Sequence, residues 1–170
     1  LIWALWVLAP LGSAAALVFA YVFYTSMLKS DEGNDRMKEI AGYVREGAMA
    51  YLWQQYKIVT LFFILAVIIL CVLSFVAKVQ SQFVPFAFLT GGFFSGLAGF
   101  LGMKTATSAS SRTAAAARES LDRGLRVAFR SGAVMGLVVV GLGLIDICIW
   151  FVILRAVNVL GWAHISLSEA

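Results

Sequence analysis

The sequence predicts an all-α membrane protein with four transmembrane helices and helical extensions on the cytoplasmic side. Of the 170 residues, 62% are hydrophobic and 13% are charged, whereas soluble domains are near half apolar and a quarter charged. The apolar residues gather in four stretches, each long enough to cross about 30 Å of hydrocarbon as a helix. The stretches do not alternate polar and apolar residues, as the strands of a membrane barrel would.

Composition also excludes several classes of protein. A soluble fold of this length could not bury so much apolar surface, which excludes a soluble enzyme, a secreted disulfide scaffold, a disordered chain and a fibre. The net charge of +4 comes from 13 Lys and Arg against 9 Asp and Glu. Because these basic residues flank apolar spans, where they set orientation, we expect the lipid bilayer as a partner and no nucleic acid.

The four apolar stretches define the expected helices, and charged residues end most of them. The first stretch already begins at Leu1, so we expect the chain to be an excerpt of a longer protein. The expected units are a transmembrane helix over 1–28, an amphipathic cytoplasmic helix continuing into a second transmembrane helix over 34–79, a third with a cytoplasmic extension over 83–117, a cytoplasmic helix and a fourth transmembrane helix over 118–156, and an external loop over 157–170.

Charge predicts the orientation of these helices. Segments 29–57 and 104–130 hold five and six of the 13 Lys and Arg, and the opposite side holds only Lys78 and Arg155. Cytoplasmic loops carry an excess of Lys and Arg. We therefore expect both segments in the cytoplasm, the N-terminus outside, and a multi-pass protein of the cell (inner) membrane.

The first cytoplasmic segment has helical periodicity. Apolar residues from Met37 to Leu52 recur at helical spacing, and Asn34 is a plausible N-cap with Asp35 in the first turn. Two interpretations stay open. The helix either lies on the bilayer surface, which Trp53 and Tyr56 would fit, or is a rigid extension of the second span packed on its neighbours.

The second cytoplasmic segment is also expected to be helical. Residues 105–117 are nearly all Ala, Ser and Thr and can continue the third span. The pairs Glu119–Arg123 and Asp122–Arg126 have the spacing and order of favourable helix ion pairs, each contributing a few tenths of a kcal/mol. We expect a break in the helix near Gly124.

Small residues mark the faces of the third and fourth spans that are expected to pack. They are spaced as small-xxx-small steps, which let helix backbones approach closely in lipid. A glycine-rich phosphate loop is the competing interpretation, and it fails because these glycines lie within spans, without the strand, turn and Lys that such a loop needs. The candidate packing residues are Gly92, Gly96, Gly99, Gly132 and Gly136.

The sequence contains few residues that could act as catalytic groups or ligands within its spans. Asp146 is the one acid well inside a span, where a carboxylate is costly and suggests either a function or a bond to a neighbouring helix. The cysteines Cys71 and Cys148 and the lone His164 form no metal or disulfide pattern. Residues alone predict no catalytic, cofactor-binding or metal-ligating residue, and leave a non-catalytic four-helix membrane scaffold and a small transporter subunit using Asp146 as alternatives.

Three segments resemble a known family. They are DEG at 31–33 leading to IAGYVREGAMAYL at 40–52 and QYK at 55–57; FVPFAFLTGGFFSGLAGFLGMKTAT at 83–107; and RGLRVAFRSGAVMGL at 123–137. Together they resemble the N-terminal part of the membrane-integral pyrophosphatases, which are pyrophosphate-energised proton or sodium pumps. The segments are long and occur in order over nearly the whole chain.

The resemblance implies a function that the residues alone do not. It implies a larger multi-helix bundle working as a homodimer, in which cytoplasmic pyrophosphate is hydrolysed with Mg²⁺, and in some subfamilies K⁺, to export protons or sodium. The family's catalytic segments begin after the fourth span, so the resemblance transfers no catalytic or metal-binding residue to this chain. Its helices are expected to belong mainly to an outer ring, with the remaining helices of the same protein as partners.

Overall fold

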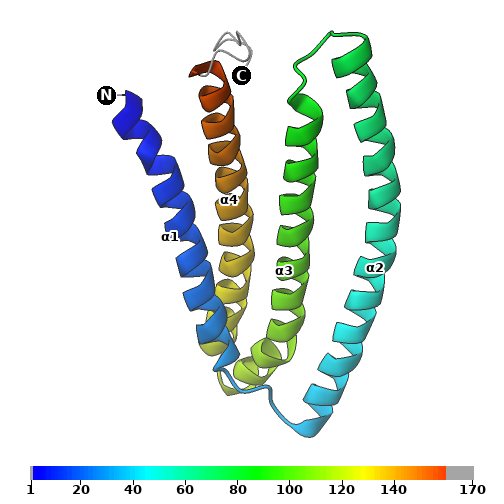
Figure 1. Cartoon of the computed structure of the whole chain (residues 1–170). Coiled ribbons are helices and arrows are strands. Elements are labelled where there is room, and N and C mark those ends of the chain that lie inside the picture. The colour runs from blue at the N-terminus through cyan, green and yellow to red at the C-terminus, as the bar shows by residue number, and fades with distance from the viewer. Residues whose placement is uncertain (1, 160–170) are drawn as a thin grey trace.

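Four long helices make up the structure, which confirms the predicted fold class. The computed structural model describes residues 2–159, and the side chains of residues 6–157. Every helix is long and apolar enough to cross a membrane, and the described part of the chain contains no strand. The elements are α1 (Ile2–Leu28), α2 (Asp35–Cys71), the short π-helix η1 (Val72–Val76), α3 (Val84–Glu119) and α4 (Leu121–Val159) (Figure 1).

The helices lie side by side in the order α1, α4, α3, α2. Helix α4 packs against both α1 and α3, and α2 packs mainly on α3 (Figure 1). The N-terminus and the α2–α3 connection lie at one end of the bundle, and the α1–α2 loop and the α3–α4 turn lie at the other. This arrangement puts the two strongly basic connections at the same end, as the charge pattern predicts.

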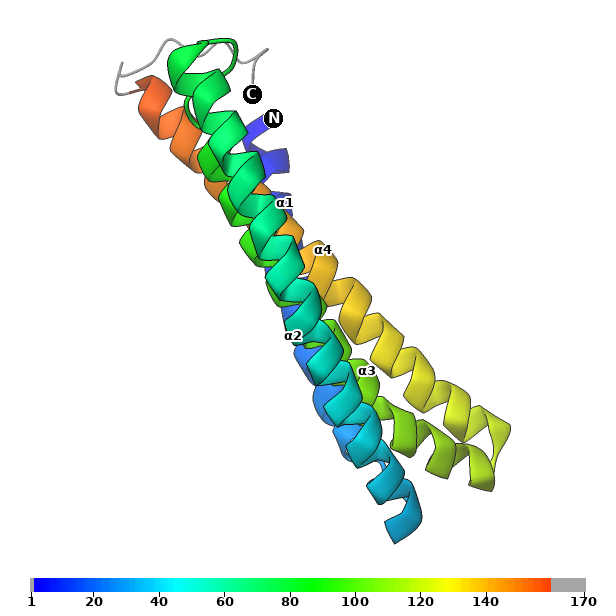
Figure 2. The same cartoon turned by 90° about the vertical axis from the view of Figure 1, so that its right-hand side faces the viewer.

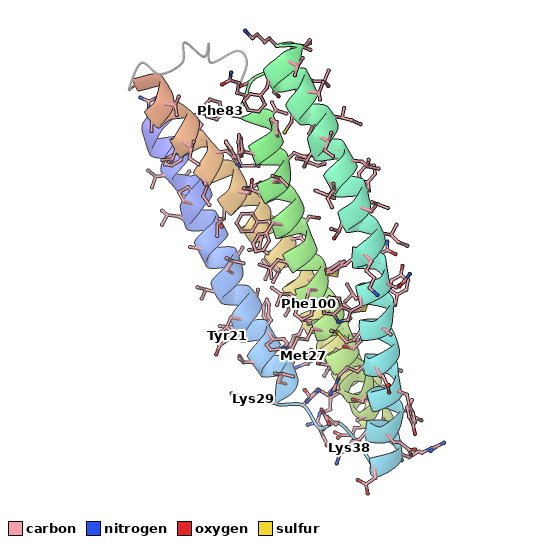
Figure 3. All side chains as sticks on the ribbon, turned by 45° about the vertical axis from the view of Figure 1, so that its right-hand side comes forward. Tyr21, Met27, Lys29, Lys38, Phe83 and Phe100 are labelled. Atoms are coloured by element: carbon pink, nitrogen blue, oxygen red, sulfur yellow. The ribbon has the colours of Figure 1, made fainter. Side chains whose placement is uncertain are left out.

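The core consists largely of small and β-branched residues. Its main cluster joins three helices and contains Ala20, Ala98, Val134, Val138 and Leu142. A second cluster, of Met27, Ala109 and Val127, lies nearer the basic end, where Met27 is fully buried (Figure 3). Small side chains allow close backbone approach, which holds membrane helices together in the absence of a hydrophobic driving force.

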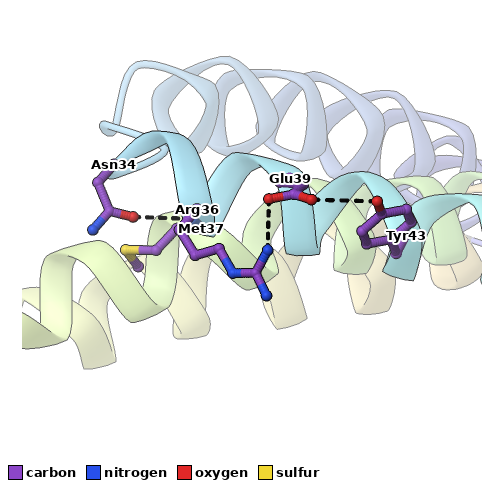
Figure 4. A network of polar contacts seen from close by, with 5 residues as sticks. All are labelled: Asn34, Arg36, Met37, Glu39 and Tyr43. Atoms are coloured by element: carbon purple, nitrogen blue, oxygen red, sulfur yellow. Dashed lines mark hydrogen bonds and ion pairs between the residues drawn. The ribbon is translucent and has the colours of Figure 1, made fainter.

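Helix α2 is one continuous helix of 37 residues, and this decides between the two interpretations of its first half. At 1.5 Å per residue it measures about 55 Å, well beyond the hydrocarbon thickness. The side-chain carboxamide oxygen of Asn34 accepts a hydrogen bond from the Met37 N–H at 2.9 Å, as the predicted N-cap requires (Figure 4). The structure therefore has a continuous helical extension of the span. Tyr43, Tyr51 and Trp53 in it are exposed, so the packing on neighbouring helices that was expected for this extension stays a prediction.

The α2–α3 connection departs from the expected helix over 34–79. The α-helix ends at Cys71, a π-helical turn continues to Val76, and Lys78 follows in a left-handed conformation with φ 52°. The Gln80 side chain donates to the Leu70 carbonyl at 3.2 Å and to the Ser74 hydroxyl at 3.1 Å. These bonds stabilise the π-helical turn at the end of the helix. The spacing of apolar residues in the sequence does not predict such a turn.

The expected break near Gly124 is wrong, because the chain turns at Ser120. Ser120 has extended backbone angles (φ −163°, ψ 151°), and its hydroxyl accepts a hydrogen bond from the Arg123 N–H at 3.2 Å. Ser120 is therefore the N-cap of α4, with Asp122 in the first turn, a combination that favours helix starts. Helix α3 ends at Glu119 rather than Ala117, and α4 begins at Leu121 and runs through Gly124.

At its far end, α4 also exceeds its expected bounds. It continues to Val159, so residues 157–159 are helical and do not belong to the external loop expected over 157–170. The rest of that expected loop, with His164, lies outside the described residues.

Candidate functional site

Gly92 and Gly99 on α3 both face α2. A Cβ at Gly92 would overlap the ring of Phe63, and that ring also stacks on Phe88 with centroids 4.7 Å apart. A Cβ at Gly99 would lie 3.4 Å from the Tyr56 hydroxyl. These two glycines therefore leave room for aromatic side chains of α2, rather than for a second helix backbone.

Gly96 contacts α2 through its backbone carbonyl rather than through the space left by its missing side chain. The Tyr56 hydroxyl donates a hydrogen bond of 2.6 Å to the Gly96 carbonyl, while no heavy atom lies within 4 Å of the position a Cβ would take there. The same open space surrounds Gly132 and Gly136 on α4. Among the described residues these two have no packing partner, and the helix-packing role expected for them stays a prediction.

Two further glycines of α4, Gly141 and Gly124, also lie close against a neighbouring helix. A Cβ at Gly141 would lie 2.7 Å from Leu17, and the Gly141 carbonyl accepts a hydrogen bond of 2.7 Å from the Ser13 hydroxyl of α1. A Cβ at Gly124 would lie 2.8 Å from the Ala117 Cβ and 3.0 Å from the Ala117 Cα. Both glycines set the distance between α4 and a neighbouring helix.

Asp146 faces α3 inside the apolar part of the bundle. One carboxylate oxygen would lie 3.5 Å from a Cβ at Gly91, and the other is buried without a hydrogen-bond partner among the described residues. One turn further along α4, the Trp150 indole N–H donates to the Thr90 hydroxyl at 2.7 Å. The α3–α4 interface therefore contains a cluster of three polar side chains, Thr90, Asp146 and Trp150. Asp146 is the one that has no hydrogen-bond partner in the described part of the chain.

Arg112 ties the α1–α2 loop to α3 at the basic end. Its guanidinium lies 2.6 Å from the Glu32 carboxylate and donates to the Ser108 carbonyl at 2.5 Å. Gly33, with φ +87°, brings the loop against Ala115. The Arg112 side chain is only 11% exposed and the Glu32 side chain 35%, so losing Glu32 would leave a largely buried guanidinium without its charge partner, which is costly.

Several other charges at this end form ion pairs along one helix or across the α3–α4 turn. Glu119 with Arg123 and Asp122 with Arg126 form the ion pairs that their spacing predicts. Arg36, near the start of α2, pairs with Glu39 at 2.8 Å, and Glu39 also accepts a hydrogen bond from Tyr43 (Figure 4). These pairs are exposed, so each contributes well under 1 kcal/mol.

Sequence reasoning missed Ser13 and Arg112 as structural residues. Ser13 is a lone hydroxyl among apolar residues, and Arg112 is a lone charge in a run of Ala, Ser and Thr. In both cases an isolated polar side chain on an otherwise uniform helix was the available signal. Within residues 2–159, no group of three His, Cys, Asp or Glu side chains is placed to hold a metal ion.

Taken together, these features define a membrane-spanning bundle with packed glycines, one intramembrane acid and projecting cationic helices. The family model described as inorganic H⁺ pyrophosphatase matches residues 14–168, and the chain belongs to this family. This confirms the family that the three sequence segments resemble.

Several pumps are similar to the chain in sequence. It is 61% identical over 150 residues, 88% of its length, to a Bacteroides thetaiotaomicron protein whose name describes a K⁺-stimulated pyrophosphate-energized sodium pump. It is 41% identical over 138 residues, 81% of its length, to K⁺-insensitive pyrophosphate-energized proton pump 2 of Moorella thermoacetica. It is 42% identical over 138 residues to the K⁺-insensitive pyrophosphate-energized proton pump of Methanosarcina mazei. The chain spans about a fifth of the length of these relatives.

Proposed function

We propose that this chain is the N-terminal part of a membrane pump that couples hydrolysis of cytoplasmic pyrophosphate to ion export. The observation that carries the proposal is the 61% identity over 150 residues to a pyrophosphate-energized pump. The same relationship favours a pump over a free-standing scaffold or a small transporter, the two alternatives that the residues alone left open.

The transported ion is proposed to be sodium, with stimulation by K⁺. The identity of 61% is to a protein named for these properties, against 41% and 42% to the two K⁺-insensitive proton pumps above. The sequence by itself left the choice between proton and sodium open.

Within the pump, the chain is proposed to support the catalytic helices rather than to contain them. Helices α1 to α4 are tied to one another by glycines, hydroxyls and one partly buried ion pair. The described residues offer no carboxylate cluster suited to Mg²⁺, an ion that prefers several oxygen ligands. On the family resemblance, Mg²⁺, K⁺ and pyrophosphate are proposed to be held by other parts of the pump, and the pump is proposed to be a homodimer.

The proposed orientation places residues 29–57 and 104–130 in the cytoplasm and the N-terminus outside. Its support is the excess of Lys and Arg at one end of the bundle. Pyrophosphate carries several negative charges and cannot enter lipid, so a cytoplasmic site above the membrane suits it. Arg112 is engaged with Glu32, which leaves the more distal cations to act on an approaching anion over a longer range.

Ion transport by the full-length pump tests the proposal. Inverted membrane vesicles carrying the pump should take up ²²Na⁺ when pyrophosphate and Mg²⁺ are added, more rapidly with K⁺ present. A protonophore should leave this uptake intact. Proton uptake that the protonophore abolishes, without sodium uptake, would make the pump a proton pump, and vesicles that do not hydrolyse pyrophosphate would contradict the proposed function itself.

A further inference from the structure

Helix α2 lies at the edge of the bundle and has one face turned away from the other described helices. It packs mainly on α3, where the Tyr56 hydroxyl bonds to the Gly96 carbonyl and the Phe63 ring lies at Gly92. Figure 2, which views the bundle from the α2 side, shows α2 in front of the other helices. The face of α2 away from α3 therefore has no partner within residues 2–159.

This face carries a regular series of exposed residues, which we call the outer seam. Its members are spaced alternately four and three positions apart, the spacing by which two long helices pack along one line. The charged residues in the same stretch, Arg45, Glu46 and Lys57, do not fall on the series. The outer seam consists of Ile40, Val44, Gly47, Tyr51, Gln54, Ile58, Leu61 and Leu65, all of them exposed.

The first part of the outer seam lies beyond the reach of lipid. Residues 58–76 carry no charge and are about as long as the hydrocarbon is thick, so the hydrocarbon ends near Ile58. At 1.5 Å per residue, Val44 lies about 21 Å and Ile40 about 27 Å beyond that point, whereas headgroups extend only about 5–8 Å. Val44 and Ile40 are 46% and 49% exposed, and lipid cannot cover them.

A partner for the outer seam has to cross the membrane surface as α2 does. The seam continues from Ile40, in water, to Leu65, in the hydrocarbon, without a charged residue on it. A soluble protein would cover only its first part, and lipid only its last. The chain spans about a fifth of the length of the relatives, so about four fifths of such a pump can supply a helix of this kind.

Gly47 favours a helix of different sequence over a second copy of α2. No heavy atom lies within 4 Å of the position its Cβ would take, and its neighbours on the seam are Val44 and Tyr51. Two parallel α2 helices would bring Gly47 against Gly47 between these larger side chains and leave a hole, whereas helix interfaces are close-packed. A different helix can place a large side chain there.

We propose that the outer seam of α2 is the docking surface for another long helix of the same pump. This partner helix crosses the membrane and continues about 27 Å beyond the hydrocarbon beside α2. It presents apolar residues at the same alternating spacing, with a large side chain opposite Gly47. The proposal rests on the proposed function only in taking this chain as one part of a longer pump.

Photo-crosslinking of the full-length pump in membranes tests the docking surface. Benzoylphenylalanine is placed at Val44 or Tyr51 on the outer seam, and at Glu46 as the matched control, which is exposed at the same height but about 160° round the helix from Val44. Positions 44 and 51 should crosslink to a peptide outside residues 1–170 of the same polypeptide, with a yield severalfold higher than at position 46. The crosslinked protein should migrate as a single subunit in SDS.

Two matched glycines keep the test decisive if a crosslinking variant folds poorly. Gly47 and Gly42 both lie on α2 with open space at the Cβ position, but only Gly47 is on the outer seam. Gly47→Leu should lower the melting temperature of the full-length pump by several degrees, because overpacking is destabilising. Gly42→Leu should leave it unchanged or raise it, because leucine favours the helix.

Several results would overturn the proposal. Crosslinks between two subunits would make the outer seam an interface between copies, and crosslinks to lipid at position 44 would place the extension in the bilayer. Crosslinks to a separate soluble protein would assign the seam to that partner. Equal yields at positions 44 and 46, or equal melting temperatures of the two glycine variants, would show that no helix docks there.

Pyrophosphate hydrolysis, measured in parallel on the parent protein, reports separately on the proposed function. A crosslink from position 44 to another part of a polypeptide that does not hydrolyse pyrophosphate would support the docking surface and contradict the pump. Hydrolysis without that crosslink would support the pump and contradict the docking surface.

Discussion

The hydroxyl of Ser13 on α1 donates a hydrogen bond of 2.7 Å to the carbonyl of Gly141 on α4. Ser13 is fully buried, and the two residues are separated by 128 positions in the sequence. An α-helical carbonyl already accepts a bond from its own helix, so this second bond requires the helices to be close. The absence of a side chain at Gly141 allows that approach.

Replacing Ser13 by Ala should therefore loosen α1 from α4. Interhelical hydrogen bonds in membrane proteins contribute about 0.6 kcal/mol on average, and we expect a loss of that order in the free energy of unfolding of the full-length pump by SDS. Ser95→Ala is the matched control, because Ser95 is an exposed serine of α3 without a hydrogen bond to another described residue. Equal losses in both variants would contradict a specific role for Ser13.

Gly141→Val should be more damaging than Ser13→Ala. A Cβ at this position already lies 2.7 Å from Leu17 and 3.4 Å from the Ser13 carbonyl, and overpacking typically costs about 1–3 kcal/mol. Gly143→Val is the control on the same helix, since nothing lies within 4 Å of its Cβ position. Thermal unfolding should separate the two variants, and similar melting temperatures would refute the close approach.

Gly124→Ala should open the α3–α4 hairpin. The new Cβ would lie 3.0 Å from the Ala117 Cα, and backbone atoms cannot move aside as a side-chain end can. We expect faster tryptic cleavage at Arg118 and Arg123, whereas Gly132→Ala, in open space, should leave cleavage unchanged and favour the helix by up to about 1 kcal/mol. An unchanged cleavage rate in Gly124→Ala would show that the hairpin tolerates a side chain.

Arg112→Met should detach the α1–α2 loop, because Glu32 would lose its partner. Removing one member of a fully buried pair costs about 3–5 kcal/mol, and the 35% exposure of the Glu32 side chain reduces this expectation. Arg123→Met breaks an exposed pair and should cost about 0.3–0.5 kcal/mol. A double-mutant cycle of Arg112→Met with Glu32→Gln checks the coupling, and additive effects would mean that the two side chains do not interact.

Asp146→Asn tests whether the intramembrane carboxylate is structural. One of its oxygens lacks a partner among the described residues, and an amide of the same shape avoids the cost of a buried charge. We expect an unchanged or higher melting temperature of the full-length pump. A lower melting temperature, or hydrolysis without ion transport, would instead indicate that Asp146 binds a group in the rest of the pump.

The proposed orientation can be checked with single cysteines that replace Arg45, Arg123 and Lys78 in a background without Cys71 and Cys148. A membrane-impermeant maleimide should label positions 45 and 123 only from the cytoplasmic side, because both lie at the basic end of the bundle. It should label position 78 only from outside. The reverse pattern would invert the bundle. Labelling of 45 and 78 from the same side would contradict a second transmembrane helix.

The sequence alone determined the four spans, the Asn34 cap and the two ion pairs beside Ser120. Each depends on residues close together in the chain: apolar length, a side-chain acceptor before a helix, and charges four residues apart. The Ser120 hydroxyl is also a local signal for a helix start, but the break was expected at Gly124, four residues later.

Only the tertiary structure decided which helices are neighbours and which glycines pack. Small residues occur on several faces of α3 and α4, and each face would suit a close partner equally well. Gly92 and Gly141 became contact positions because helix rotation brings Phe63 and Leu17 to them, while Gly132 and Gly136 face open space among the described residues. Spacing within one helix identifies a face that can pack, but the partner depends on the relative rotation of two helices, which spacing does not encode.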